Sequence, residues 1–212
     1  TSEKHALIGV SMTGISSVGV LKLDMEAASE LVKKENERVA RLINIKKAAR
    51  CTTVKPEGTA SLVVGSSSGI HAWHSPYYIR RIRVGKNEPL YKYLTQTNPA
   101  LVEDDFFKPT TEAVISIPQV APEGAITRTE SALDLLSRVS LVYKKWIEPG
   151  HRSGHNLNNC STTITVKDSE WETVGKWMWD NRDSYTALSI LPEDLGTYVQ
   201  APFEEISQIQ FE

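Results

Sequence analysis

Lys55-Pro56-Glu57-Gly58-Thr59-Ala60-Ser61 joins a β-prone segment to a short apolar one. The residues before it, 50–55, read Arg-Cys-Thr-Thr-Val-Lys and suit a strand that ends at the proline. The residues after it, 61–64, read Ser-Leu-Val-Val and suit a short apolar helix. A strand, a glycine loop and a helix in this order predict an α/β unit.

The start of the helix in this unit has the properties of an anion site. The first amide N–H groups of a helix have no partner within it, and the helix dipole is positive at that end, so phosphate oxygens bind well there. Gly58 allows close backbone approach, and the hydroxyls of Thr59 and Ser61 add possible donors. An ordinary N-capped helix is the alternative. The loop is neither a P-loop nor a dinucleotide fingerprint, because both glycine patterns are absent.

Outward from this loop, hydrophobic periodicity predicts strands that alternate with helices. The expected strands cover residues 6–10, 50–55, 114–118, 161–166 and 185–191, and the expected helices cover residues 24–49, 130–147 and 169–181. We expect Pro118 to stop its strand, Asp24 to cap the first helix, and Ser169 with Glu172 to form a capping box. Residues 98–111 read as a surface excursion, and the tail from Pro192 reads as irregular. The alternation predicts an α/β fold.

The composition is that of an ordinary soluble domain. The chain has 212 residues, of which 40% are hydrophobic and 24% are charged, with a net charge of −2. This charge gives no support for a nucleic-acid partner, and no apolar run approaches the roughly 18 residues of a membrane span. Two cysteines cannot build a disulfide scaffold, so we expect a reducing, cytoplasmic setting.

The first residues suggest that the chain is a piece of something longer. It begins at Thr1 and enters an apolar segment at Ala6 almost at once, whereas a free-standing domain usually has a looser entry. A catalytic N-terminal threonine, activated by its own amine, is the weaker interpretation of Thr1.

Seven stretches of the chain match one enzyme family in the same order: residues 54–61, 67–71, 74–81, 165–167, 170–171, 188–192 and 198–205. They resemble class II ribonucleotide reductases, the adenosylcobalamin-dependent ribonucleoside-triphosphate reductases of the monomeric type. The first and last stretches are the most specific. The resemblance covers most of the chain.

The resemblance implies that residues 1–212 are the C-terminal part of a ten-stranded α/β barrel of the ribonucleotide reductase and glycyl radical enzyme type. The N-terminal half of the barrel and a C-terminal cysteine tail are then missing. The implied activity is the radical reduction of ribonucleotides to deoxyribonucleotides, for DNA replication. The implied partners are the ribonucleotide substrate, the missing N-terminal part and a thioredoxin-type reductant, and the implied cofactor is adenosylcobalamin, bound by the full enzyme.

The resemblance also implies roles for two groups of residues. The substrate phosphates are expected to bind at Pro56, Glu57, Gly58, Thr59, Ala60 and Ser61. The wall of the substrate pocket is expected at Ser67, Ser68, Gly69 and Ile70. No catalytic residue is assigned, because the Cys-x-Glu of the family has no counterpart in this chain. We expect Cys51 and Cys160 to be packed residues without a redox role.

Other interpretations remain open at this point. The chain is alternatively a nucleotide-binding fragment without activity, or a non-functional fragment whose open strand edges aggregate. The basic aromatic residues 77–83 are expected on a barrel-edge strand with exposed arginines, with nucleic-acid stacking as the alternative. A zinc site has little support, because the possible ligands lack the spacing of a known site. Those ligands are His71, His74, His151, His155 and Cys160.

Overall fold

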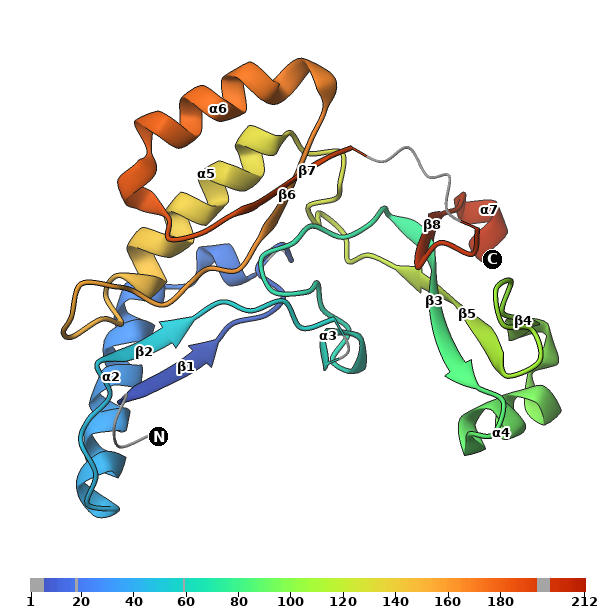
Figure 1. Cartoon of the computed structure of the whole chain (residues 1–212), viewed down its shortest axis with the longest axis horizontal. Coiled ribbons are helices and arrows are strands. Elements are labelled where there is room, and N and C mark those ends of the chain that lie inside the picture. Colours follow the sequence, from blue (N-terminus) through green and yellow to red (C-terminus); the bar gives the residue numbers. More distant parts are fainter. Residues whose placement is uncertain (1–5, 18, 59, 194–198) are drawn as a thin grey trace. The chain divides into compact units, whose positions relative to one another are not determined.

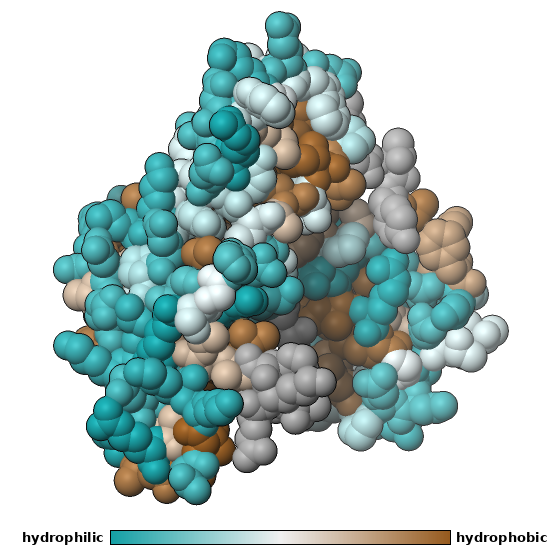
Figure 2. All heavy atoms as spheres, turned by 60° about the vertical axis from the view of Figure 1, so that its left-hand side comes forward, coloured by the Kyte–Doolittle hydropathy of each residue, from teal (hydrophilic) through white to brown (hydrophobic). Residues whose placement is uncertain are grey.

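The computed structural model describes residues 6–17, 19–58, 60–193 and 199–212. Thr1 and Thr59 therefore lie outside the described residues. The chain divides into two compact units, Thr1–Trp73 with Gly124–Glu193, and His74–Glu123 with Asp194–Glu212. On the face drawn in Figure 2, hydrophilic residues predominate and apolar residues form separate clusters. Within the described residues, no helix is both long and apolar enough to cross a membrane.

The first unit contains two pairs of parallel strands. β1 (Leu7–Ser11) pairs with β2 (Arg50–Thr53), and β6 (Thr163–Val166) pairs with β7 (Ser189–Pro192). A parallel bridge between Val54 and Cys160 connects the two pairs, so all four strands run in one direction. Each parallel pair is joined through a helix, as parallel strands require.

Three main helices pack against these strands (Figure 1). They are α2 (Met25–Leu42), α5 (Ala132–Val142) and α6 (Trp171–Asp180). α2 packs against β2, and α5 packs against β6 and α6. A π-helical turn, Tyr143–Ile147, continues α5. The core between these elements includes Leu136, Val139, Ile147, Ile164, Val166 and Val174, all of them at most 2% exposed. The predicted α/β class is confirmed in this unit.

The predicted helix over residues 24–49 is correct at its start and wrong at its end. The Asp24 carboxylate accepts a hydrogen bond from Ala27 N at 3.0 Å, which confirms the N-cap. The helix stops at Leu42, and Asn44 adopts a left-handed conformation with φ of 55°. The chain thereby reverses, and Ala49 N donates to the carbonyl of Ala6 beside β1. The residues expected to form the last helical turns instead lead the chain into β2, which pairs with β1.

Two other predicted strands begin later than expected, and one predicted capping box is absent. The strands expected at residues 161–166 and 185–191 begin only at Thr163 and Ser189. Tyr185 lies before the strand; its hydroxyl donates to Met178 O and its ring stacks on Trp177. The prediction that Ser169 and Glu172 form a capping box is wrong. A 3₁₀ turn, Asp168–Glu170, precedes α6 instead, and the carboxylate of Glu170 accepts from Lys167 N at 3.0 Å.

The second unit is an antiparallel sheet that the sequence did not predict. Its order is β4-β5-β3-β8. The strands are β3 (Tyr77–Gly85), β4 (Val102–Asp104), β5 (Glu112–Val120) and β8 (Phe203–Glu205), and the helices are α4 (Pro89–Thr97) and α7 (Gln208–Phe211). The segment 98–111, expected to be a surface excursion, contributes β4, and the tail, expected to be irregular, contributes β8. β3 lies between two strands, so it is not the predicted edge strand.

Pro118 lies inside β5, so the expectation that it stops a strand is wrong. Asp105 N donates to Glu112 O, which shows that residue 112 turns its backbone groups toward β4. Backbone direction alternates along a strand, so the nitrogen of Pro118 also faces that side. β4 extends only as far as Ile115. The proline nitrogen therefore faces an open edge, where no ladder hydrogen bond is lost.

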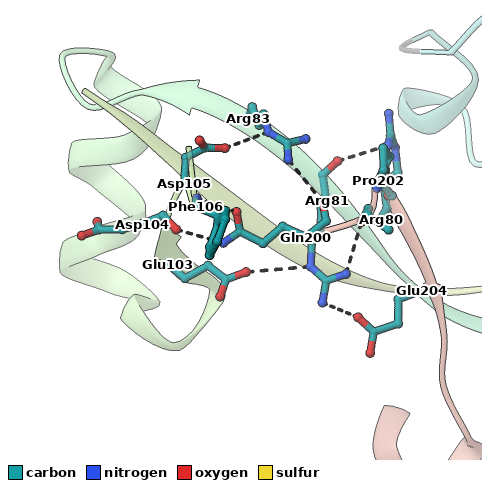
Figure 3. Close-up of polar contacts among 11 residues, drawn as sticks. Arg80, Arg81, Arg83, Glu103, Asp104, Asp105, Phe106, Gln200, Pro202 and Glu204 are labelled. Atoms are coloured by element: carbon teal, nitrogen blue, oxygen red, sulfur yellow. Dashed lines mark hydrogen bonds and ion pairs between the residues drawn. The ribbon is translucent and has the colours of Figure 1, made fainter. Parts of the chain in front are cut away.

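The arginines of β3 are paired within the sheet and are not free on its surface (Figure 3). Arg81 forms an ion pair with Glu204 of β8, and only 13% of its side chain is exposed. Arg83 contacts the buried carboxylate of Asp105 at 2.8 Å. The side chain of Gln200 bridges the tail to this region, since it donates to Asp104 O and accepts from Phe106 N. These contacts hold the tail on the edge of β3.

Candidate phosphate-binding site

The candidate site follows the carboxyl ends of β1 and β2. Because these strands are parallel, their carboxyl ends lie at the same edge, which is where α/β proteins commonly bind ligands. Lys55 N donates to the hydroxyl of Ser11 at 3.0 Å. The loop predicted to bind phosphate therefore lies beside residues 11–14, which the sequence analysis did not include in the site.

The loop at residues 57–61 opens a short helix, α3 (Ala60–Val63). Ser61 N donates to Glu57 O at 3.0 Å, and Glu57 N donates to the Ser68 hydroxyl at 2.9 Å. Within the part of the chain that the structure describes, the amides of Gly58 and Ala60 have no hydrogen-bond acceptor. The amides of Glu57 and Ser61, also expected to face an anion, are thus occupied by the protein itself.

A hollow of about 160 Å³ lies beside this loop. Its lining residues come from the segment after β1 and from the loop itself: Ser11, Met12, Thr13, Glu57, Ala60 and Val64. A Cβ added to Gly58 would meet no atom within 4 Å, so packing does not require a glycine there. Ser61 is only 3% exposed and faces the protein interior. The hollow is smaller than the roughly 300–1,000 Å³ of ligand pockets, and its size suits a small group.

The predicted wall, residues 67–70, lies against the loop. A Cβ on Gly69 would approach Lys55 O to 2.8 Å, and the residue has φ of 56°, so both space and conformation require glycine. Thr13 ties the wall to the segment after β1: its hydroxyl donates to Ser67 O at 2.9 Å and accepts from Gly69 N at 3.0 Å. Ser11 and Thr13 were missed because their role depends on the pairing of β1 with β2.

The wall residues differ in exposure. Ile70 is fully buried, and its carbonyl accepts hydrogen bonds from Ser16 Oγ and Arg138 Nε. Ser67 is 4% exposed, and its hydroxyl has no hydrogen-bond partner among the described residues. Buried hydroxyls nearly always have a partner. Ser68 is half-buried and contacts the loop directly through Glu57 N.

Neither thiol has the properties of a reactive cysteine. Burial raises the pKa of Cys160 to about 11, and burial also raises the pKa of Cys51 against the opposing effect of Arg152. Cys51 lies in a hydrogen-bonded cluster with Asn36 and Arg152, in which Arg152 Nη1 approaches its sulfur to 3.2 Å. A thiol with a raised pKa forms little of the reactive thiolate. The described residues contain no cluster of three metal-ligating side chains.

Comparison with known proteins identifies the relatives of this chain. No family model matches it. An adenosylcobalamin-dependent ribonucleoside-triphosphate reductase from Euglena gracilis is 27% identical over 218 residues, and the match covers 99% of this chain. The chain is a relative of these reductases. The predicted resemblance is thereby confirmed.

Other reductases give the same result. A probable adenosylcobalamin-dependent ribonucleoside-triphosphate reductase from Dictyostelium discoideum is 28% identical over 98% of the chain, and one from Lactobacillus leichmannii is 28% identical over 85%. The crystal structure of a B-12 dependent (class II) ribonucleotide reductase superimposes with a TM-score of 0.77 at 24% identity, and it covers 99% of the chain. The chain spans only 28% of the length of the Euglena reductase and 33% of the solved one.

Proposed function

We propose that this chain supplies the substrate-phosphate part of the active site of an adenosylcobalamin-dependent ribonucleotide reductase. The observation that carries the proposal is the similarity to enzymes of this name over 98–99% of the chain. In the proposed enzyme a ribonucleotide, in the first place a ribonucleoside triphosphate, is reduced to a deoxyribonucleotide. The remainder of the enzyme supplies the cysteine chemistry, and a thioredoxin-type protein supplies the electrons.

The proposed phosphate contacts come from residues 56–61. The amides of Gly58 and Ala60 have no acceptor among the described residues, and Ala60 lines the hollow. Phosphate oxygens accept hydrogen bonds, so they can pair with these two N–H donors. α3 has only four residues, so its dipole is small, and the attraction must come mainly from individual N–H groups. Thr59, which we propose as a further contact, lies outside the described residues.

The proposed wall, Ser67–Ile70 in the sequence, contributes shape and one polar group. The hydroxyl of Ser67 is buried without a partner in the described structure. An unpaired buried hydroxyl costs about 1–3 kcal/mol, so a bound ligand that pairs with it gains affinity. Gly69 lets this segment approach Lys55 closely. Ile70 supports the wall from within the core.

We further propose that β1, β2, β6 and β7 belong to a ten-stranded α/β barrel that is completed by the missing part of the enzyme. The strands are all parallel and are staggered, because Val54 at the end of β2 pairs with Cys160, before β6 begins. Stagger of this kind accompanies barrel closure. Leu7 and Ile8 of β1 are 47% and 43% exposed, as expected for a strand that lacks its neighbour.

The cofactor of the proposed enzyme would supply the radical chemistry, while the protein binds and orients the substrate. The hollow beside residues 57–64 is too small for a corrin ring. We therefore assign no residue of this chain to adenosylcobalamin. The role proposed for the chain is to hold the phosphates and to exclude water from one side of the substrate.

A pair of glycine variants tests the proposal. Gly58→Val places a side chain beside the open amides, and Gly19→Val is the matched control, because a Cβ at either position meets no atom within 4 Å. The protein that contains this chain, with its N-terminal part, is assayed for adenosylcobalamin-dependent reduction of a ribonucleoside triphosphate. We expect Gly58→Val to raise KM at least about tenfold, as loss of two or more charge-assisted hydrogen bonds implies, and Gly19→Val to leave it unchanged. A folded protein that binds triphosphates without reducing them would identify a nucleotide-binding fragment instead.

A further inference from the structure

We propose that His71 is a positioning residue whose neutral imidazole, protonated on Nδ1, holds Ser68 against the phosphate loop. This inference rests on the proposed function, because the loop in question is the proposed phosphate site. From the sequence, His71 is a possible metal ligand and the last residue of the matching stretch 67–71. In the structure, both of its ring nitrogens form hydrogen bonds to backbone groups.

The hydrogen bonds of His71 determine where its proton lies. Thr163 N, at the start of β6, lies 3.1 Å from Nε2. A backbone N–H can only donate, so Nε2 must be the unprotonated acceptor. Nδ1 lies 3.2 Å from Ser68 O, which can only accept, so Nδ1 must carry the proton. The two contacts together require a neutral ring in a single tautomer.

Ser68 connects His71 to the phosphate loop through two different groups. Its carbonyl accepts from the ring and also from His71 N at 3.0 Å. Its hydroxyl accepts from Glu57 N at 2.9 Å. The result is a continuous series of hydrogen bonds from Thr163 through His71 and Ser68 to Glu57. Glu57 N is thereby turned to the protein, and the amides of Gly58 and Ala60 are the ones left for an anion.

Burial and charge keep the ring neutral. The charged groups that face it are Arg128 and Glu130, from the segment before α5, and Arg138 from α5. Burial is the main cause that lowers the pKa of His71, and the two arginines add to it, while the Ser68 carbonyl and Glu130 oppose them. Glu130 is largely neutralised, because it forms a two-fold ion pair with Arg138 at 2.6 and 2.7 Å.

His71 does not itself contact the proposed ligand. Both ring nitrogens bond to backbone groups, and the residue does not line the hollow beside the loop. A role in proton transfer would need a free nitrogen within hydrogen-bond reach of the substrate. The arrangement therefore supports positioning and not catalysis.

Substitutions can separate the two contacts of the ring. In His71→Gln the amide oxygen can accept from Thr163 N as Nε2 does, but no donor remains for Ser68. In His71→Asn the amide nitrogen can donate to Ser68 O as Nδ1 does, but the side chain is too short for Thr163. His71→Ala removes both contacts. His155→Ala is the matched control, because His155 is exposed.

Amide hydrogen exchange, followed by NMR without ligand, measures the effect. We expect the amides of Glu57 and Thr163 both to exchange up to about tenfold faster in His71→Ala, as loss of a hydrogen bond implies. Only Glu57 should be affected in His71→Gln and only Thr163 in His71→Asn. Unchanged exchange of Glu57 in both His71→Ala and His71→Gln would overturn the proposal.

Two further measurements test the tautomer of His71 and phosphate binding separately. Imidazole ¹⁵N shifts of the unmodified protein at pH 7.5 should show a neutral ring protonated on Nδ1, and protonation on Nε2 would refute the inference even if no variant folds. Calorimetry with inorganic tripolyphosphate tests the phosphate site separately. Failure of the unmodified protein to bind it, with the exchange and tautomer results as expected, would count against the phosphate site and not against the positioning of Ser68.

Discussion

Glu57 N donates a hydrogen bond to the hydroxyl of Ser68 at 2.9 Å, and this bond joins the two segments that the sequence assigns to one substrate pocket. The two residues are eleven positions apart, with α3 between them. The bond occupies one amide of the loop, whereas the amide of the next residue, Gly58, has no acceptor among the described residues.

Removal of the Ser68 hydroxyl should destabilise the protein. Ser68→Ala leaves the part-buried amide of Glu57 without its acceptor, and we expect the free energy of unfolding to fall by about 1–2 kcal/mol. Urea denaturation measures the change. Ser66→Ala is the control, since the Ser66 hydroxyl makes only a long contact of 3.5 Å with Ser67 O, and it should cost less than about 0.5 kcal/mol. Equal losses of free energy of unfolding in the two variants would show that the hydrogen bond between Glu57 and Ser68 does not stabilise the protein measurably.

Alanine at Gly69 should cost more than alanine at Gly65. Both glycines have a left-handed conformation, with φ of 56° and 61°, so both variants carry the conformational penalty of about 1–2 kcal/mol. Only at Gly69 does the added Cβ meet backbone, with Lys55 O at 2.8 Å, whereas Gly65 has no atom within 4 Å. We expect Gly69→Ala to lower the free energy of unfolding by about 1–3 kcal/mol more than Gly65→Ala. If thermal or urea unfolding gave the two variants the same loss of free energy of unfolding, the close contact between Gly69 and Lys55 O would not limit the size of residue 69.

The stability of the protein should depend on pH through His71. The folded state lowers the pKa of His71 below its unfolded value of about 6.5. The unfolded state then binds the proton more readily, so the free energy of unfolding falls as the pH drops below about 6.5, by up to about 1.4 kcal/mol for each pH unit until the folded pKa is reached.

The variant His71→Gln isolates this contribution. It has no titrating ring, so its stability should change less between pH 7.5 and 5 than that of the unmodified protein. Urea denaturation at several pH values gives the two curves. Parallel curves would show that His71 is protonated as readily in the folded protein as in the unfolded chain.

Loss of the charge on Glu130 should be strongly destabilising. Glu130 and Arg138 form a buried ion pair whose side chains are 11% and 6% exposed. Glu130→Gln leaves the arginine buried without a counter-charge, which typically costs about 3–5 kcal/mol. Glu26→Gln breaks an ion pair with Lys145 that is more than half exposed, so we expect a cost below about 1 kcal/mol. Thermal unfolding compares the two variants, and similar melting temperatures would contradict the prediction.

The sequence predicts best what depends on nearby residues. The cap at Asp24 and the strand before Pro56 follow from local chemistry, and the structure has both. The order of the matching stretches identified the reductase relatives, because motif order survives where overall identity is low. The end of α2 at Leu42, by contrast, depends on pairing of Ala49 with Ala6, which no local pattern reports.

The sequence alone determined the α/β class of the parallel-stranded unit and the reductase relationship, and it led to the proposal that two segments form one substrate pocket. The tertiary structure alone decided that β3 is an inner strand of an antiparallel sheet, that Ser11 and Thr13 adjoin the loop, and that His71 ties Ser68 to β6. The physical reason is distance along the chain. The hydrogen bond between residues 71 and 163 joins segments that only folding brings together, and the pairing of strands is set by packing that the local sequence does not specify.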